Sequence, residues 1–533
     1  MNNLLIAEQF HQLSKLMELH QENVFKIRAI ANAASIIEKL NREITLDNYQ
    51  QLSSIKGIGK NILEKIKEIL IYGKIKELDE YEKQTPTSVV ELLNIRGLGS
   101  SKVYKLWKEL NITNIDDLLK AAENNELTKL KGFSSKTQQT LIENIHFYIQ
   151  SKNKLQLGIA LNIAKDIINL LKQHQINAEI TGELRRHCEI IKQIEFITTQ
   201  KISHHLLHQI QQLSSIPVVI HSVNENEYYY KLVETTGSKD FLESIHFYNL
   251  SHKKFNSEKE VFASLDTAYI LPPQREDISE FFYCSAIKPV SHPIEYTDFK
   301  GILHCHSTYS DGVNTLEEMA IYTHQQRFEY LGICDHSQSA TYANGLSPER
   351  VLEQHQEIEK LNHQFKNFKI LKGIESDILK NGNLDYDEDI LKQFDFVVAS
   401  IHSHFEMSEK EATERIIKAI ENPYTNILGH PTGRLLLIRK GYPVNHKKII
   451  DACAANKVVI ELNANTYRLD IDWRWIRYCV EKGVYIAINP DAHSATAIQD
   501  TLYGVMVAQK AGLKKENCIN TFHLKDLLKI FKK

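Results

Sequence analysis

The chain has 533 residues, enough for three or four domains with cores of their own. Its hydrophobic fraction of 42% and charged fraction of 25% are ordinary for a water-soluble globular protein and exclude a chain too polar to build a core. The formal net charge of −3 does not indicate a protein that binds nucleic acids through its overall charge, so any basic surface must be local.

Cysteine usage and the first residues indicate the compartment. The seven cysteines are odd in number and show no CxxC spacing, which favours a reducing environment over a disulfide framework. The opening MNNLLIAEQF lacks the charged region and the long apolar run of a signal peptide or a membrane span. We therefore expect a cytoplasmic protein without a membrane partner.

The first 80 residues or so predict helices and a tight glycine turn. Leu13, Leu16 and Met17 recur at helical spacing. Further on, Gly57-Ile-Gly59 stands between an apolar residue and an amphipathic helix, which is typical of a helix–hairpin–helix motif. Glycine permits a positive φ and the close approach of a partner, and the free amides at the start of the next helix favour a phosphate.

This motif recurs at Gly97-Leu-Gly99 and, in a weaker form, at Gly132, where Ser134 replaces the second glycine. A single such turn is also a common connector of helices. Repeated copies with a basic residue beside the turn favour contacts with the phosphate backbone, which carry no base specificity. For the third copy both interpretations remain open. The residues expected to bind DNA are Gly57, Gly59, Lys60, Gly97, Gly99 and Lys102.

This half of the chain resembles the amino-terminal region of family X DNA polymerases. The resemblance implies a lyase-like helical domain at 1–82 and helix–hairpin–helix fingers at 83–152. In family members with lyase activity, a lysine in the helix after the first hairpin forms a Schiff base with an abasic sugar, and Lys65 matches that position. Such an amine needs a lowered pKa. Lys65 is therefore a candidate lyase nucleophile or, alternatively, a lysine on a solvated helix face.

Residues 153–284 resemble the palm and thumb of the same family but depart from it at the catalytic positions. The family motif resembles Gly-Ser-x-Arg-Arg followed by Asp-x-Asp. Here Gly182, Arg185 and Arg186 keep the frame. Gln193 and Glu195 stand where the two metal-binding aspartates are expected, and no aspartate occurs from 167 to 239, where the third is expected.

These replacements bear directly on nucleotidyl transfer. A two-metal mechanism needs several anionic oxygens at fixed spacing, and a neutral glutamine beside one glutamate does not supply them. We therefore expect the polymerase activity to be lost or weak. The alternative is a repositioned set of carboxylates that includes Glu183, which replaces the family's serine, and Glu189.

Other palm and thumb motifs are present. Thr235-Thr-Gly-Ser-Lys239 matches the family's TGSK turn, and residues 269–277 match its thumb-end motif, which implies that the fold and a DNA cleft are retained. The aromatic run Tyr228-Tyr229-Tyr230 either stacks on bases or, as we expect, packs in the core beside a strand.

A predicted linker at 285–295 leads to residues 296–533, where apolar runs repeatedly end in metal-binding residue types. In the first run, Ile302-Leu303 leads to His304 and His306, and residues two apart on a strand point to the same side. Later runs end at Asp335-His336, Glu375, His402, His430 and Asp491-Ala-His493. Amphipathic helices separate the runs. The pattern predicts a (β/α) barrel with its chemistry at the carboxyl ends of the strands, rather than scattered core histidines.

This half resembles the PHP (polymerase and histidinol phosphatase) domain, and the whole chain resembles the bacterial PolX proteins that carry one at the carboxyl end. The resemblance implies a multidomain protein: an α-helical helix–hairpin–helix region, an α+β nucleotidyltransferase-like palm and thumb, and an α/β barrel of the distorted (β/α)7 type. It also implies nine metal ligands: His304, His306, Asp311, His336, Glu375, His402, His430, Asp491 and His493.

The ligand types indicate the metal. Histidine mixed with carboxylate suits Mn²⁺, Zn²⁺ or Fe²⁺ better than Mg²⁺, which prefers oxygen. We expect two or three divalent ions, Mn²⁺ or Zn²⁺ in the first place and Fe²⁺ as a further option. Asp335 is expected to orient His336 or a ligand water, and His404 is expected to lie beside the centre rather than in it.

Three further residues are expected to contact the substrate: Arg434, Asn463 and Arg468. Arg434 either clamps a phosphate through two hydrogen bonds or makes a surface salt bridge. Trp473 and Trp475 are expected to pack the loop that carries Arg468 rather than to read bases.

The resemblance implies a DNA-binding repair protein whose PHP domain is a metal-dependent phosphoesterase. We expect a 3′–5′ exonuclease, or a nuclease that processes 3′ ends or abasic sites, acting on gapped, nicked or 3′-end DNA, and a monomer. One alternative is an active gap-filling polymerase with a proofreading PHP exonuclease. The other is a DNA-binding scaffold whose barrel hydrolyses small phosphomonoesters.

Overall fold

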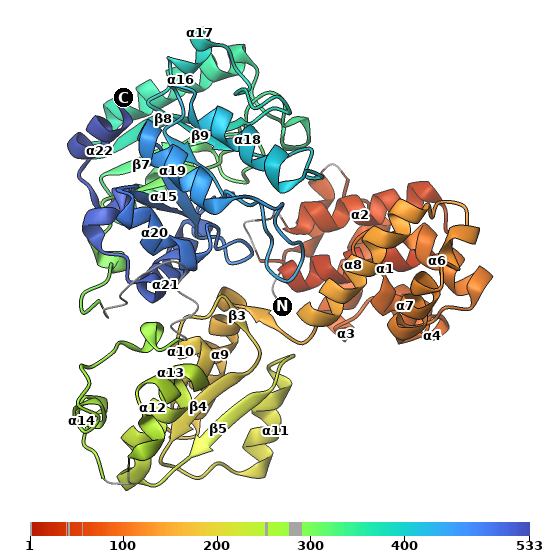
Figure 1. Cartoon of the computed structure of the whole chain (residues 1–533). Helices are drawn as coiled ribbons and strands as arrows, with labels where there is room; N and C mark the ends of the chain where they lie inside the picture. Colours follow the sequence, from red (N-terminus) through yellow and green to blue (C-terminus); the bar gives the residue numbers. More distant parts are fainter. Residues whose placement is uncertain are drawn as a thin grey trace. The chain divides into compact units, whose positions relative to one another are not determined.

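The computed structural model describes residues 3–38, 40, 43–55, 57–250, 254–276 and 290–532 (Figure 1). The chain divides into two compact units, Met1–Lys152 and Asn153–Lys533. Part of the predicted linker at 285–295, residue Asp277 of the thumb-end motif, and Cys284 lie outside the described residues. The six described cysteines are free thiols. No described helix combines the length and the apolar composition needed to cross a bilayer.

The first unit is helical, as predicted, and Leu13, Leu16 and Met17 are all buried in its core. The turns that open the three predicted hairpins have φ of +103° at Gly57, +87° at Gly97 and +106° at Gly132. Only glycine adopts such values without strain. The helices are α1 (Asn3–Leu19), α2 (Val24–Glu38), α3 (Lys60–Tyr72), α4 (Lys76–Gln84), α5 (Thr87–Leu92), α6 (Ser100–Leu110), α7 (Ile115–Glu123) and α8 (Ser135–Ser151), with 3-10 helices at Tyr49–Ser54 and Leu127–Lys129.

The second unit begins with an α+β region, which is called the palm below. Its helices are α9 (Leu157–Gln173), α10 (Gly182–Arg185), α11 (His204–Gln212), α12 (Tyr228–Thr236), α13 (Lys239–Ser244) and α14 (Glu258–Ala263), with 3-10 helices at Glu225–Glu227, Phe247–Asn249 and Pro272–Gln274. Its strands are β1 (Leu155–Gln156), β2 (Glu179–Thr181), β3 (Ile190–Ile191), β4 (Ile194–Thr198) and β5 (Val218–Ser222).

Two small sheets organise the palm. β4 lies between β2, to which it is antiparallel, and β5, to which it is parallel, while β1 and β3 form a separate antiparallel pair. Ile194 and Phe196 of β4 belong to one core with residues of α9 and α11. The tyrosine run lies on helix α12 rather than in a strand, so that expectation was wrong in its element, although α12 packs against β2 and β4. Tyr230 is nevertheless buried, with its ring centroid 4.7 Å from that of Phe247.

The rest of the second unit is a barrel of seven parallel strands, as predicted, in the order β12-β11-β10-β9-β8-β7-β6. A parallel bridge between Cys305 and Ala492 brings the last strand's end beside the first, which nearly closes the sheet. The strands are β6 (Gly301–Cys305), β7 (Tyr330–Ile333), β8 (Lys369–Asp377), β9 (Phe396–Ser400), β10 (Ile427–Leu428), β11 (Val459–Asn463) and β12 (Ile486–Asn489).

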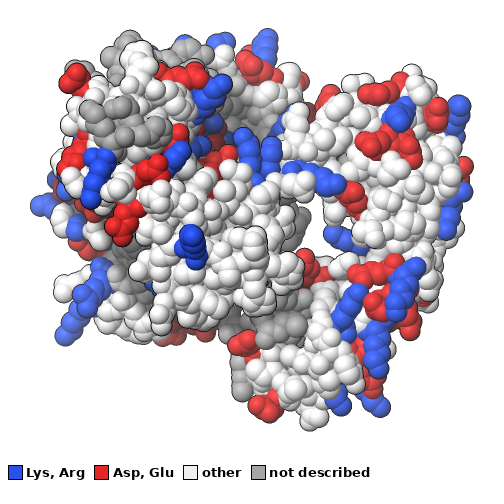
Figure 2. Space-filling view, turned by 90° about the horizontal axis from the view of Figure 1, so that it is seen from below, with Lys and Arg blue, Asp and Glu red and all other residues white. Residues whose placement is uncertain are grey.

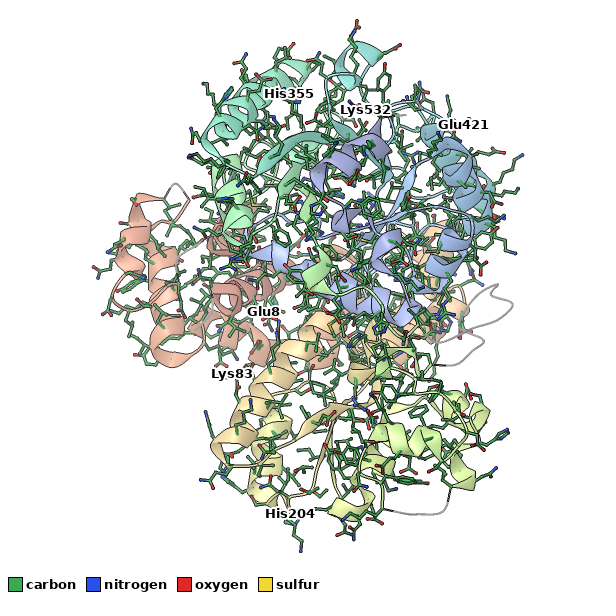
Figure 3. All side chains as sticks on the ribbon, turned by 90° about the vertical axis from the view of Figure 1, so that its left-hand side faces the viewer. Glu8, Lys83, His204, His355, Glu421 and Lys532 are labelled. Carbon is green, nitrogen blue, oxygen red and sulfur yellow. The ribbon has the colours of Figure 1, made fainter. Side chains whose placement is uncertain are left out.

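Helices surround these strands, as Figure 3 shows for the helix of the labelled His355 (α16) and the helix that precedes Glu421 (α18). They are α15 (Leu316–Gln325), α16 (Pro348–Gln364), α17 (Glu388–Leu391), α18 (Glu409–Ile420), α19 (His446–Asn456), α20 (Ile476–Glu481), α21 (Thr501–Ala511) and α22 (Leu524–Phe531). 3-10 helices lie at Tyr296–Asp298, Thr341–Ala343, Trp473–Trp475, Thr496–Asp500, Lys515–Asn517 and Ile519–Thr521.

The last helix determines which end of the barrel is open. Tyr330, Phe396 and Ile427 stand at the amino-terminal ends of their strands and share a buried cluster with Leu527 and Phe531 of α22. The rings of Phe396 and Phe531 stack with centroids 5.2 Å apart. Because α22 packs at the amino-terminal end, the carboxyl ends of the strands are left for the polar residues that follow them.

Candidate metal centre

The carboxyl ends of the barrel strands bring the nine predicted ligands together. They come from β6 and its following loop (His304, His306, Asp311), from β8 (Glu375), and from the loops after β7, β9, β10 and β12 (His336, His402, His430, Asp491, His493). Eight of them form three groups whose ligand atoms lie within 4.8 Å of one another: His306, Asp311, His336 and His493; His304, His306 and Asp491; and His336, Glu375 and His402.

Glu375 stands at the middle of this arrangement. Its Oε1 lies 2.9 Å from Nε2 of His430, which joins the ninth residue to the others, and 3.2 Å from Nε2 of His402 and 3.3 Å from Nε2 of His304. Its Oε2 lies 3.0 Å from Nδ1 of His336. One carboxylate thus faces four imidazoles, so Glu375 would be available as a ligand to divalent ions held among them.

Of the other two carboxylates, Asp491 lies inside the cluster and Asp311 lies on the side that faces outward. Asp491 Oδ1 lies 3.0 Å from His306 Nε2, and Asp311 Oδ1 lies 3.3 Å from His493 Nε2. His304 and His306 are fully buried, whereas the side chain of His493 is 40% exposed. Asp311 and His493 therefore line the side from which a substrate can approach.

The end of β6 is not a regular strand. A shift of register between Ile302 and Cys305 accompanies a φ of +56° at His304. His430 and Asp491 also have positive φ, +21° and +51°. Such backbone strain is common where side chains must be aimed at one point. The two histidines of the first run thus converge through an irregular strand end, whereas the sequence pattern had predicted a regular alternation.

The close packing of carboxylates and imidazoles shifts the pKa values of several of these residues. Burial alone would raise the pKa of the Glu375 carboxyl, but the surrounding histidines hold that pKa well below its usual value. Burial likewise opposes protonation of His402, yet Glu375 and Asp377 raise its pKa to about 10. For His306 burial prevails, and with His493 and His336 nearby its pKa falls to about 3. Neighbouring carboxylates thus favour the charged form of His402, whereas burial favours the neutral form of His306.

Several buried atoms of the cluster have no hydrogen-bond partner. These are Nε2 of His304, Nδ1 of His306, His336 and His430, and Oε2 of Glu375. His336 Nδ1 and Glu375 Oε2 lie 3.0 Å apart without hydrogen-bond geometry, so neither atom satisfies the other. Buried polar atoms are normally paired. Histidine nitrogens and carboxylate oxygens left open in this way fit divalent cations.

A second layer of carboxylates holds the imidazoles, and the sequence pattern did not assign it. Glu461 Oε2 lies 2.6 Å from His304 Nδ1, and Asp377 Oδ1 lies 2.5 Å from His402 Nδ1. A carboxylate on the far nitrogen fixes the tautomer and orientation of a ligating histidine. β11 is the one strand of the barrel for which the sequence pattern predicted no metal ligand. That gap is the signal by which Glu461, on this strand, could have been found.

The hydrogen bonds of Asp335 go to the loop of the first ligands and to α16, and its expected contact with a ligand water stays a prediction. Its carboxylate accepts hydrogen bonds from Ser307 N at 2.8 Å, from the Ser310 hydroxyl at 2.5 Å and from Gln354 Nε2 at 2.6 Å. It therefore fixes the loop between His306 and Asp311 rather than His336. His404 is exposed and belongs to none of the metal-capable groups, in agreement with its expected place beside the centre.

The three predicted substrate contacts lie in different surroundings. Arg468 is nearest to the ligands, with Nε 3.4 Å from Asp491 Oδ2. Asn463 is fully buried and donates to both Glu461 and Asp491, which makes it a support of the ligands. Arg434 donates to Asp472 and to two backbone carbonyl groups, which favours the salt-bridge interpretation over a phosphate clamp.

The predicted DNA-binding residues lie in the first unit. Gly59 and Gly99 precede α3 and α6 directly, with open space where a Cβ would stand. In the third hairpin the hydroxyl of Ser134 accepts from Thr137 N and so occupies a helix-start amide. Lys65 is buried, not on a solvated face as its alternative assumed, and its Nζ lies 2.5 Å from Glu77 Oε2.

The palm residues that replace the polymerase motif are committed to other partners. Glu195 Oε2 lies 3.0 Å from His221 Nε2, and a Cβ at Gly182, where φ is +65°, would meet Glu195. Arg185 and Arg186 pair with Glu258 and Glu276. Within the described residues, the groups able to hold a metal all lie in the barrel.

The proposed carboxylate alternative is not favoured by this geometry. Glu183 Oε2 accepts from Lys192 N at 2.6 Å, whereas Glu189 pairs with Arg474 of the barrel. On the face shown in Figure 2, Lys and Arg side chains lie among Asp and Glu side chains, beside a broad area without charged residues. This agrees with the formal charge of −3.

Comparisons with known proteins bear on both halves of the chain. Residues 1–75 match the family model of a helix-hairpin-helix domain, residues 89–146 that of a SAM-like helix-hairpin-helix tandem, and residues 303–465 that of the PHP domain. A Bacillus subtilis (strain 168) protein named DNA polymerase/3'-5' exonuclease PolX is 34% identical over 563 aligned positions, which cover 98% of each chain. A probable phosphatase of Thermoanaerobacter sp. (strain X514) is 32% identical over 171 positions, or 30% of this chain and 67% of its own.

Proposed function

Because this chain belongs to the bacterial PolX proteins, the family X DNA polymerases with a carboxyl-terminal PHP domain, we propose that it is a DNA repair nuclease that removes nucleotides from 3′ ends. The observation that carries the proposal is the convergence of nine nitrogen- and oxygen-bearing side chains at the open end of the barrel. Incubation of 5′-labelled DNA with Mn²⁺ or Zn²⁺ tests it. Stepwise shortening from the 3′ end is expected, and an intact oligonucleotide would contradict it.

Metal chemistry defines the reaction class. The nine ligands would hold two or three divalent ions, which supply activation of water and neutralise the charge on a phosphate. Mn²⁺ or Zn²⁺ fits the mixed donor set best, and Fe²⁺ is a further option. Glu461 and Asp377 hold His304 and His402 by their far nitrogens, so these rings need no reorganisation when a substrate arrives.

Residues at the open side of the site determine where a substrate enters and what it contacts. Asp311 and His493 line the accessible side, while Arg468 stands beside Asp491 with its side chain 18% exposed. From there the guanidinium can donate to a phosphate oxygen and hold the scissile bond over the ligands. Arg468 is thus the proposed substrate contact, with Asn463 and Arg434 as residues that support the loop around it.

An exposed aromatic ring distinguishes DNA from a small phosphoester. Tyr342 was not singled out by the sequence; it is 69% exposed and its ring centroid lies 6.1 Å from that of His336. Stacking of a base on such a ring contributes about 1–3 kcal/mol. We therefore propose that Tyr342 receives the terminal base of the 3′ end.

Replacing Tyr342 by alanine is expected to raise KM for a 3′ end about tenfold, because about 1.4 kcal/mol of stacking corresponds to that factor. Tyr342→Phe keeps the ring and should retain the wild-type KM. Hydrolysis of glycerol 3-phosphate, which has no base, should not change. Tyr485→Ala, at the opposite end of the barrel directly before β12, is the control. An unchanged KM for DNA in Tyr342→Ala would refute the stacking role.

The hairpins favour DNA over small substrates and can be tested without the nuclease. Gly59→Glu with Gly99→Glu should weaken binding of duplex DNA about tenfold per hairpin, because each change puts a negative charge where a phosphate would meet free amides. A hydrogen bond to a charged group contributes roughly 1.5–3 kcal/mol. Fluorescence anisotropy measures the Kd, and the dependence of the Kd on salt should become shallower.

The matched control is Gly59→Ala with Gly99→Ala, since neither glycine has a positive φ and a Cβ at either meets nothing within 4 Å. This variant should fold and bind nearly as the wild type does. Equal Kd values for the two double variants would contradict phosphate binding at these turns.

We further propose that polymerase activity is lost or weak, and the pairing of Glu195 with His221 supports this. A gap-filling polymerase with proofreading remains the alternative, as does a scaffold whose barrel acts on small phosphomonoesters. Lys65 remains a candidate lyase nucleophile, held in an ion pair with Glu77 that a substrate would have to displace.

A further inference from the structure

The loop that carries Arg468, residues 464–472, contacts the palm directly near its start and through Arg474 at its end. Near its start, Thr466 Oγ1 accepts a hydrogen bond from Gly158 N at 2.9 Å. At its end, Asp472 pairs with Arg474, whose NH1 lies 2.9 Å from Oε1 of Glu189. Gly158 and Glu189 belong to the part of the chain whose polymerase motif is replaced, which raises the question of what this part does.

The small β1–β3 pair sets Gly158 and Glu189 side by side. Gln156 is paired with Ile190 in this sheet, and Leu157 N donates to the carbonyl of Glu189 at 3.1 Å. The fit against the loop is tight, because a Cβ at Gly158 would lie 2.8 Å from Thr466 Oγ1 and 2.7 Å from the Tyr503 ring. The part of the palm that contacts the loop is therefore held in place by the β1–β3 pair.

A chain of alternating charges leads from Glu189 to Arg468. Glu189 is 9% exposed and accepts from Trp473 Nε1 at 3.2 Å as well as from Arg474. Asp472, next along the chain of charges, accepts from Arg434 NH1 at 2.7 Å. Arg434 in turn donates through Nε to the backbone carbonyl of Arg468 at 2.9 Å and through NH2 to that of Leu469.

Each member of this chain depends on its neighbours. Partly buried charges that lose a partner are destabilised and rearrange. If Glu189 is neutral, Arg474 is expected to shift toward Asp472, which it already contacts, and to compete there with Arg434, so that the hold of Arg434 on the two carbonyl groups weakens. The guanidinium of Arg468, 3.4 Å from Asp491, is then free to leave the ligands.

We propose that Glu189 is a positioning residue of the nuclease: through Arg474, Asp472 and Arg434 it holds the 464–472 loop so that Arg468 faces the metal ligands. The palm thus acts as a brace for the barrel's substrate loop. This inference depends on the proposed nuclease function for its effect on turnover, but the brace itself is a property of the folded chain.

Glu189→Gln is the informative variant, because the amide keeps the shape and can still accept from Trp473 or Arg474 while the charge is removed. It should lower kcat/KM for 3′-end removal about tenfold, the low end of what outer residues of a metal site contribute. In the Arg468→Ala background the same change should have little further effect. An equal loss in both backgrounds, or no loss in the wild type, would overturn the proposal.

Hydrogen exchange supplies a readout that does not need activity. The amides of Arg468 and Leu469 donate to the carbonyl of Asn465 and report opening of the loop. Glu189→Gln should speed exchange in 464–472 severalfold and leave the strands β8 and β9 unchanged. Glu234→Gln, which removes the charge from a palm pair with Lys231, is the control and should change neither measurement.

The two readouts separate this inference from the proposed function. If the wild type leaves DNA intact, the nuclease proposal fails, and faster exchange in Glu189→Gln still supports the brace. If the wild type removes nucleotides and exchange in 464–472 does not change, the brace is refuted while the nuclease stands. Gly158→Ala crowds Thr466 near the start of the loop. It should speed hydrogen exchange in 464–472 and lower kcat/KM about tenfold, as Glu189→Gln does.

Discussion

Replacing His304 by alanine is expected to lower the rate of nucleotide removal from a 3′ end at least about a thousandfold, with the fold retained. His304 is fully buried, and its Nε2 faces Glu375 at 3.3 Å and Asp491 at 3.6 Å. Its loss removes a ligand between two carboxylates that must share the bound charge. A factor of a thousand corresponds to about 4 kcal/mol of the barrier, within what metal ions supply to phosphoester hydrolysis.

The control for this variant comes from the second histidine pair. His404 follows β9 two residues after His402, is exposed, and lies outside the metal-capable groups, so His404→Ala should keep wild-type activity. The measurements are release of the labelled 3′ nucleotide and the number of Mn²⁺ or Zn²⁺ ions bound per chain, which should fall in His304→Ala. Activity within tenfold of the wild type would show that His304 is not a ligand of the reacting centre.

The wild type and His304→Ala together also distinguish a DNA substrate from a small phosphomonoester. If both leave the oligonucleotide intact while the wild type alone hydrolyses a small phosphomonoester, the barrel is a phosphatase on a DNA-binding scaffold. The relatives named probable phosphatases, which match 30% and 36% of this chain, make this comparison informative. Loss of DNA shortening in His304→Ala and its retention in His404→Ala would assign the reaction to this centre.

The recurrence of apolar runs that end in metal-binding residue types was enough to predict the barrel, and the resemblance to the PHP domain selected the nine side chains that the structure brings together. Most of them lie at or just past the end of an apolar run, and parallel strands must present such positions at one edge. The irregular end of β6 was not predictable in this way, because alternation assumes a regular pleat and His304 has a φ of +56°. A register shift changes the direction of a side chain at the cost of regular strand pairing. The pattern of residue types in the sequence does not show where such a shift occurs.

Residues that act through others were harder to predict. Glu461 stands on β11 among apolar residues and is recognised only once His304 is seen 2.6 Å away. Glu189 and Arg474 are 285 positions apart in the chain, and nothing in either local sequence indicates the other. For Lys65, helical spacing did not distinguish a solvated face from the buried one that it occupies.

The polymerase half of the family's activity is expected to be missing. On a gapped primer–template with Mn²⁺ and all four nucleotides, the wild type should only shorten the primer. Gln193 cannot carry the charge of an aspartate, and Glu195, the remaining carboxylate, is engaged with His221 at 3.0 Å. Removing the anionic ligands of a two-metal centre removes most of its catalysis, since positioning and charge neutralisation supply nearly all of the rate.

Exonuclease activity would hide weak extension, so the decisive protein is His304→Ala, in which the 3′ end survives. In that background no extension product is expected, or at most a rate about a thousandfold below that of a competent family member, assayed alongside. Extension that persists in His304→Ala and disappears when Glu195→Gln is added would show that the palm still binds catalytic metal. Without such extension, the contact of Gly158 with Thr466 and the pairing of Glu189 with Arg474 would account for a palm that is kept although Gln193 stands in place of a metal-binding aspartate.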